Sequence, residues 1–121
     1  MAQIPDDWIE RFGKNAHNLM PKGMEKFIPK LYETEEEKGG EEITVKDKIV
    51  WVKYFDPSSG WTWYLTEYSP EEKIAFGYVV GPFPEWGYFS LEELARVKNR
   101  FGLGIERDLY FTPKPFSQLK L

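Results

Sequence analysis

Charged side chains that lie among aromatic residues are the part of the chain that could do chemistry. Lys53 and Glu67 fall on the same predicted sheet face as the tryptophans of the stretch WTWYLTEY (61–68). Arg107 falls in phase with the apolar residues Ile105, Leu109 and Phe111 of the predicted last strand. A buried arginine needs a carboxylate or another anion, because an unpaired buried charge is very costly. We therefore predict that Arg107 pairs with Glu67 or, as second choice, with Glu85. The alternative is an anion clamp, since a guanidinium binds phosphate or carboxylate through two hydrogen bonds.

Two further carboxylates, Glu106 and Asp108, alternate onto one side of the predicted last strand. Such a pair could hold Mg²⁺, which is usually bound through one or two carboxylates. The same spacing is common on solvated strand faces, so we predict no metal site and no cofactor. With His17 as the only histidine and no cysteine, we find no Ser-His-Asp set, zinc site or thiol nucleophile, and we predict no catalytic residues.

The aromatic rings of residues 61–68 are either core or a platform for a ligand. Both faces of the predicted sheet are too apolar to be left in water. We expect the helix over 90–101 to cover one face and the front segment, with Trp8, Phe12 and Phe27, to cover the other, so we interpret most of these rings as core. Trp61 and Trp86 are the rings that we expect to contact a ligand. The residues that we predict to be largely buried are Trp63, Tyr64, Phe76, Leu94, Phe101 and Leu109.

The elements that position these residues are short strands followed by one helix. Stretches 47–55, 61–68 and 74–81 are β-branched and aromatic, and turn residues separate them. The simplest hairpin register pairs Phe55 with Trp61 and Tyr68 with Ile74. Ser90 and Glu93 form a capping box that starts a helix over 90–101, and a last strand follows over 105–111. We predict an α+β fold: a mainly antiparallel sheet of four or five strands with the helix packed across it.

A length of 121 residues indicates one domain, over residues 1–121. We expect a helical N-terminal segment (1–32) against the sheet, an acidic loop (33–42) and a body of sheet and helix (43–121). Residues 1–42 carry ten acids and six bases, a balance of −4, which equals the net charge of the whole chain. The neutral body therefore offers no broad basic surface for duplex DNA. No signal peptide or membrane span is visible, and we expect a cytoplasmic protein.

Six segments resemble a family that is classed only as a domain of unknown function. They read IPKLYETE (28–35), WTWYLTEY (61–68), FGYVVG (76–81), EWGYFSLEEL (85–94), IERDLYF (105–111) and PKPFSQL (113–119). The resemblance covers about residues 28–121. It implies a small accessory protein of a prokaryotic plasmid, phage or other mobile element, and it implies no catalytic or binding residues.

Three classes of function follow. The first is a non-catalytic interaction module that binds a protein partner, favoured because no catalytic constellation is present. The second is a single-stranded nucleic-acid binder that stacks bases on rings such as Trp51, Trp61 or Trp86, with charge from Arg107 and from the end of the predicted helix. The third is a metal-dependent enzyme, which would need the carboxylates Glu67, Glu106 and Asp108 to converge.

Overall fold

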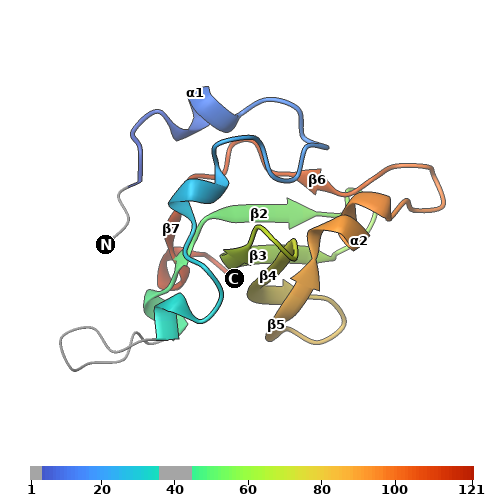
Figure 1. The fold of residues 1–121 in the computed structure, drawn as a ribbon. Coiled ribbons are helices and arrows are strands. Elements are labelled where there is room, and N and C mark those ends of the chain that lie inside the picture. Colours follow the sequence, from blue (N-terminus) through green and yellow to red (C-terminus); the bar gives the residue numbers. More distant parts are fainter. Residues whose placement is uncertain (1–3, 36–44) are drawn as a thin grey trace.

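Short strands dominate the chain, whose computed structural model describes residues 4–35 and 45–121 (Figure 1). Five strands form an antiparallel sheet in the order β5–β4–β3–β2–β6, and two more form a separate antiparallel pair, β1–β7. The strands are β1 (Ile49–Val50), β2 (Val52–Phe55), β3 (Thr62–Ser69), β4 (Ile74–Val80), β5 (Glu85–Ser90), β6 (Glu106–Arg107) and β7 (Lys114–Pro115). The α-helices are α1 (Trp8–Phe12) and α2 (Leu91–Arg96); the 3-10 helices are η1 (Glu25–Phe27), η2 (Glu33–Glu35), η3 (Val45–Asp47) and η4 (Phe116–Gln118). The predicted α+β fold with an antiparallel sheet is confirmed.

The register of the hairpins differs from the simplest one at two places. Phe55 pairs with Thr62 rather than with Trp61, so β2 is shifted by one residue against β3. Between β3 and β4, a bulge at Thr66 breaks the alternation, and beyond it Tyr68 pairs with Ala75. Because side chains alternate with a period of two, each one-residue shift moves a side chain to the other face of the sheet.

One face of the sheet, here called the inner face, carries the core. Val52, Tyr54, Trp63 and Leu65 belong to this face by their cross-strand pairing, and each is at most 9% exposed. The N-terminal segment and α2 both cover it, although the sequence suggested that they cover opposite faces. Their contributions to the same buried cluster are Trp8, Phe12, Leu19, Met24, Ile28, Leu91 and Leu94.

The opposite, outer face is an array of aromatic rings. Tyr64 and Tyr78 pair across β3 and β4, and Trp86 continues the row on β5. The C-terminal segment covers part of the array, because the Phe116 ring lies 4.9 Å from the rings of both Tyr78 and Trp86. The predicted core was therefore correct for Tyr64, Trp63 and Leu94, whereas Phe76 and Leu109 are only half-buried.

Helix α2 begins where the sequence predicted and ends about one turn early. The Ser90 hydroxyl accepts a hydrogen bond from the Glu93 backbone N–H at 3.1 Å, as in a capping box. The helix ends after Arg96, because Val97 has extended backbone angles (ψ 130°). Residues 97–104 form a loop instead, and Phe101 is 64% exposed rather than buried. The prediction of a helix to residue 101 was wrong.

The N-terminal segment consists of short helices joined by turns, as the apolar spacing indicated. In Figure 1 its first part, with α1, runs above the sheet, and the light-blue to cyan part that follows descends on the left. The predicted acidic loop (33–42) lies outside the described residues apart from its start in η2. Among the described residues, we find no helix with the length and apolar content that a bilayer crossing requires.

Candidate functional site

Arg107 is a structural anchor rather than an ion-pair partner of Glu67. Its side chain is on the inner face opposite Tyr54, whereas Glu67 lies on the outer face beside Phe76. Arg107 is 3% exposed, and its guanidinium donates four hydrogen bonds of 2.5–3.4 Å to backbone carbonyls of the N-terminal segment. The acceptors are the carbonyl oxygens of Phe12, Lys14, Asn15 and Asn18. The predicted pairing with Glu67 or Glu85 is wrong, since carbonyl dipoles satisfy the buried cation.

Arg107 and its neighbour Tyr54 are both buried. Burial lowers the pKa of Arg107 from its ordinary value, and the neighbouring Tyr54 opposes this shift. Burial also raises the pKa of Tyr54, whose hydroxyl donates a 2.6 Å hydrogen bond to the Leu19 carbonyl. An external anion would have to displace the N-terminal segment to reach Arg107, so this site holds the fold together.

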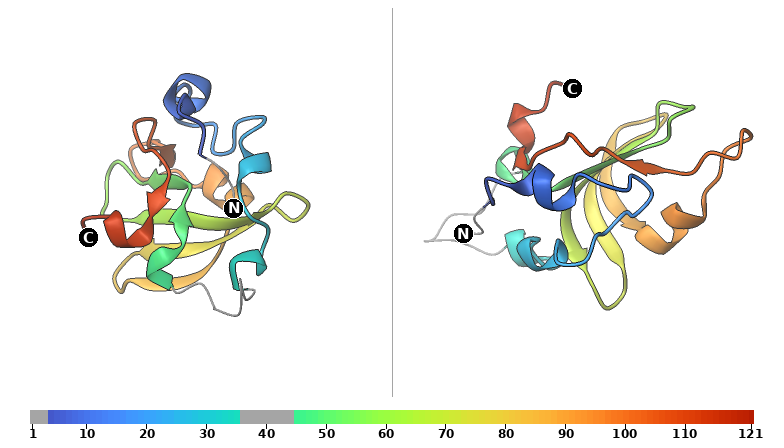
Figure 2. Two further views of the ribbon diagram at one scale, coloured as in Figure 1. Left: turned by 90° about the vertical axis from the view of Figure 1, so that its left-hand side faces the viewer. Right: turned by 90° about the horizontal axis from the view of Figure 1, so that it is seen from above.

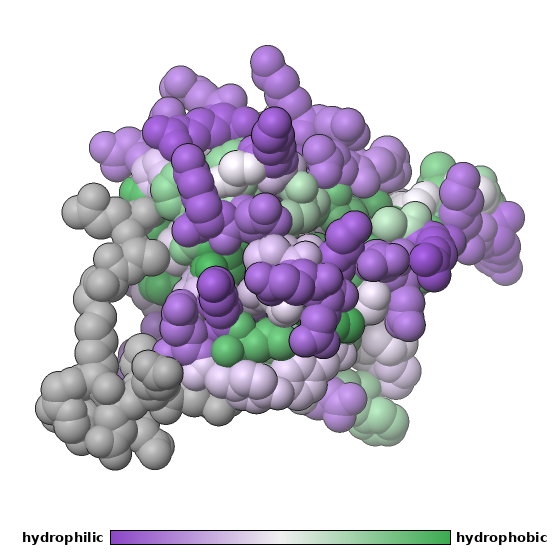
Figure 3. Space-filling view, viewed as in Figure 1, coloured by the Kyte–Doolittle hydropathy of each residue, from purple (hydrophilic) through white to green (hydrophobic). Residues whose placement is uncertain are grey.

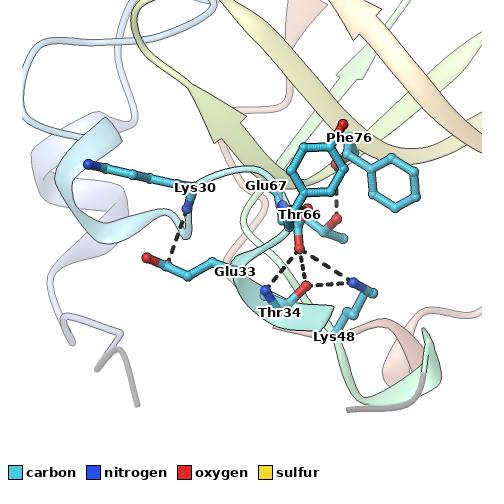
Figure 4. Close-up of polar contacts among 8 residues, drawn as sticks. Lys30, Glu33, Thr34, Lys48, Thr66, Glu67 and Phe76 are labelled. Atoms are coloured by element: carbon cyan, nitrogen blue, oxygen red, sulfur yellow. Dashed lines mark hydrogen bonds and ion pairs between the residues drawn. The ribbon is translucent and has the colours of Figure 1, made fainter. Parts of the chain in front are cut away.

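Glu67 is the centre of a second buried polar cluster (Figure 4). Its carboxylate accepts hydrogen bonds from the backbone N–H groups of Tyr32 and Thr34, at 2.9 and 3.1 Å, and from the Thr34 hydroxyl. Lys48 donates to the Thr34 hydroxyl at 2.5 Å and forms an ion pair with Glu67 at 3.5 Å. Glu67 and Lys48 are 1% and 5% exposed. The cluster therefore fastens η2 and the start of β1 to β3.

The remaining predicted polar residues lie on or near the outer face without converging. Lys53 and Asp108 form a half-exposed ion pair at 3.7 Å, and Glu106 pairs with Phe55 on the neighbouring strand. Lys53 also lines an open pocket of about 290 Å³ whose other side is formed by the C-terminal segment. In the described ranges 4–35 and 45–121, no three His, Asp or Glu side chains are grouped so that they could hold a metal ion.

The candidate ligand-binding tryptophans have different environments. Trp51, which the nucleic-acid hypothesis also used, is 1% exposed in the core. Trp86 is half-buried between Phe76 and Phe116, at centroid distances of 5.9 and 4.9 Å. Trp61 is 40% exposed, so it is the most accessible of these three rings.

Trp61 belongs to a group of three loops at one end of the sheet, which we call the loop end (residues 56–61, 81–84 and 97–104). Figure 2 shows these loops projecting together from one end of the strands. The Trp61 ring covers Gly81 so closely that a Cβ atom there would come within 2.4 Å of the ring. The large apolar side chains that the loop end exposes by 40–82% are Trp61, Phe83, Val97, Phe101 and Leu103.

Asn99 fixes the conformation of the longest of these loops. Its side-chain oxygen accepts hydrogen bonds from the backbone N–H groups of Phe101 and Leu103, at 2.9 and 3.1 Å. Its side-chain nitrogen donates to the Ser58 hydroxyl at 2.7 Å and to the Asp56 carboxylate at 3.3 Å. One amide thus organises the loop internally and ties it to the β2–β3 turn.

The charge of the loop end is set by two cations, Lys98 and Arg100, and one acid. The acid, Asp56, has its pKa held below the usual range, first by the Ser58 backbone N–H and also by Asn99, so its charge is used within the loops. Figure 3 shows hydrophobic atoms beside hydrophilic ones where the loop after α2 projects at the right-hand end. This surface is therefore apolar with a basic border.

Comparison with protein families gives one match. The family model described as "Protein of unknown function (DUF2958)" matches residues 24–119. The chain belongs to this family. Comparison with curated proteins and with solved structures gives no match.

The DUF2958 match includes the whole loop end but begins after Trp8, Phe12 and Leu19, which form part of the core. The sequence of this DUF2958 member did not reveal the loop end, because Phe101 continues the apolar spacing of the helix predicted over 90–101. A turn residue, Asn99, two places before Phe101 was the available signal that the helix had ended.

Proposed function

We propose that this protein is a non-catalytic interaction module that binds a protein partner through its loop end. The observation that supports the proposal best is the loop 97–104, in which Asn99 holds Phe101 and Leu103 in water at 64% and 48% exposure. A loop that already holds its apolar side chains in place loses less conformational entropy when it binds a partner. Aromatic rings at the centre of such a surface carry much of the binding free energy.

The other two hypotheses find less support in the geometry. Trp51 and Arg107 are buried, which removes a ring and a cation from the proposed nucleic-acid surface. Glu67 lies in a closed cluster with Lys48, away from Glu106 and Asp108, which the enzyme hypothesis required to converge. We further propose that the module acts in the cytoplasm of a prokaryotic cell that carries a mobile element, in line with its lack of cysteine.

Site-specific photo-crosslinking in the native host tests this proposal. A photoreactive side chain is placed at Leu103 or, as the matched control, at Tyr110, which is 86% exposed outside the loop end. We expect a discrete protein adduct at position 103 that persists after nuclease treatment and disappears when Phe101→Ala is added. Adducts that are the same at both positions, or that vanish with nuclease, would contradict a protein partner at the loop end.

A further inference from the structure

We infer that the loop 97–104 binds a peptide segment that combines a large apolar side chain with flanking carboxylates; this inference rests on the proposed function. The first argument is composition. Residues 96–104 contain Arg96, Lys98 and Arg100 and no acid, within a chain of net charge −4. A basic border around an apolar centre complements an acidic border around an apolar side chain.

The second argument is that these cations are available. Among the described residues, neither Lys98 nor Arg100 forms an ion pair, whereas Arg96 pairs with Glu92 at 3.5 Å. The Arg100 guanidinium lies 4.9 Å from the centroid of the Phe101 ring, so charge and apolar surface are adjacent. A carboxylate that reaches Arg100 would therefore accompany an apolar side chain against Phe101.

The third argument selects a peptide among possible occupants. A second copy of the chain that docks by the same loop would place Lys98 and Arg100 against their own copies, which like-charge repulsion disfavours. Nucleic-acid bases stack on aromatic rings, but two of the exposed side chains of this loop, Val97 and Leu103, are aliphatic. A protein segment makes use of the aliphatic and the charged parts together.

Selection from a displayed random-peptide library tests the inference on the full chain. We expect the enriched peptides to carry Asp or Glu next to Leu, Ile, Phe or Trp. For a synthetic peptide of the enriched sequence, we expect the dissociation constant to rise at least about tenfold after Phe101→Ala, and likewise after the double change Lys98→Glu with Arg100→Glu. The matched control, Lys22→Glu with Lys46→Glu, changes two exposed lysines elsewhere and should leave the dissociation constant unchanged.

The outcomes separate the inference from the proposed function. Peptides that depend on Phe101 but show no enrichment of acids, and no response to the double charge reversal, would overturn the inference and leave the interaction module standing. Failure to enrich any peptide that depends on Phe101 would overturn both. A fluorescent single-stranded oligonucleotide is measured in parallel, and binding of it that Phe101→Ala abolishes would also overturn both. Unchanged unfolding curves show that the variants remain folded, as expected for exposed positions.

Discussion

At the scale of single residues, two of the buried charged groups among the described residues, Arg107 and Glu67, have backbone partners in distant segments. Arg107 donates to four carbonyls of the N-terminal segment, and Glu67 accepts two backbone N–H groups near η2. Backbone donors and acceptors have no sequence signature, since every residue other than proline supplies both. The sequence therefore indicated that these charges are partly or fully buried but could not indicate their partners.

Replacing Arg107 tests its role as an anchor. Arg107→Met leaves four carbonyls without this donor, and we expect the free energy of unfolding to fall by about 3–5 kcal/mol. Arg107→Lys keeps the charge but cannot reach all four acceptors, because an ammonium group has three donors at one point, and it should lose less. Urea denaturation measures both, with the exposed Arg100→Met as control. Equal stability of Arg107→Met and the parent chain would contradict the anchor.

The buried tyrosine predicts loss of stability at high pH. Burial raises the pKa of Tyr54 above its ordinary value of 10.0. The unfolded chain therefore releases this proton first, so the stabilisation is complete below about pH 10 and is lost as pH rises further, by up to about 1.4 kcal/mol per pH unit. Tyr54→Phe should make this decline shallower. Urea denaturation at rising pH checks it, with the exposed Tyr110→Phe expected to leave the slope unchanged.

At the scale of elements, the pairing of β3 with β4 depends on a close approach at Gly77. A Cβ atom there would come within 1.8 Å of the Tyr64 carbonyl oxygen, whereas at its cross-strand neighbour Gly87 a Cβ atom would meet nothing within 4 Å. Gly77 therefore makes room for the backbone of β3, next to the bulge at Thr66.

The two glycines give a matched pair of substitutions. We expect Gly77→Ala to lower the free energy of unfolding by about 2–4 kcal/mol, because the β3 backbone must shift. Gly87→Ala should change it by less than about 1 kcal/mol, since its side chain enters open space. Thermal or urea denaturation compares them. If Gly77→Ala lowered the free energy of unfolding no more than Gly87→Ala does, the close approach at Gly77 would not be required for the pairing of β3 with β4.

Strand identity was predictable and strand register was not. The β-branched and aromatic stretches, with turn residues between them, correctly indicated β2, β3 and β4. The register depends on how many residues each turn uses and on the bulge at Thr66, and a difference of one residue at either place moves side chains to the other face of the sheet. This is why Lys53 and Trp63, which were predicted to share a face, lie on opposite faces. The end of α2 was missed for a related reason, because Phe101 continued the apolar period beyond the last helical residue.

At the scale of the whole molecule, the N-terminal segment completes a core that the family match only partly includes. Trp8, Phe12 and Leu19 are at most 7% exposed, yet the match begins at Met24. The same segment supplies every described acceptor of Arg107. Residues that precede the matched region therefore close part of the inner face of the sheet, beside the cover that Met24, Ile28 and α2 supply.

Removal of residues 1–23 tests this dependence. A chain that begins at Met24 exposes Trp51 and Tyr54 and leaves Arg107 without its four acceptors. We expect it to lose more than about 5 kcal/mol of unfolding free energy, enough to unfold a small domain. Circular dichroism and urea denaturation are the measurements. A cooperative transition near that of the full chain would show that the matched region folds without its cover.

The stacked indoles at the loop end make that surface observable. The ring centroids of Trp61 and Trp63 lie 5.8 Å apart, and the ring planes are inclined by 22°. Of the two rings, Trp61 is the one exposed to a partner. Two parallel chromophores at this spacing share their electronic excitation, so the pair acts as a built-in optical sensor whose chiroptical signal depends on its geometry. A ligand that tilts Trp61 would alter that signal without any attached label.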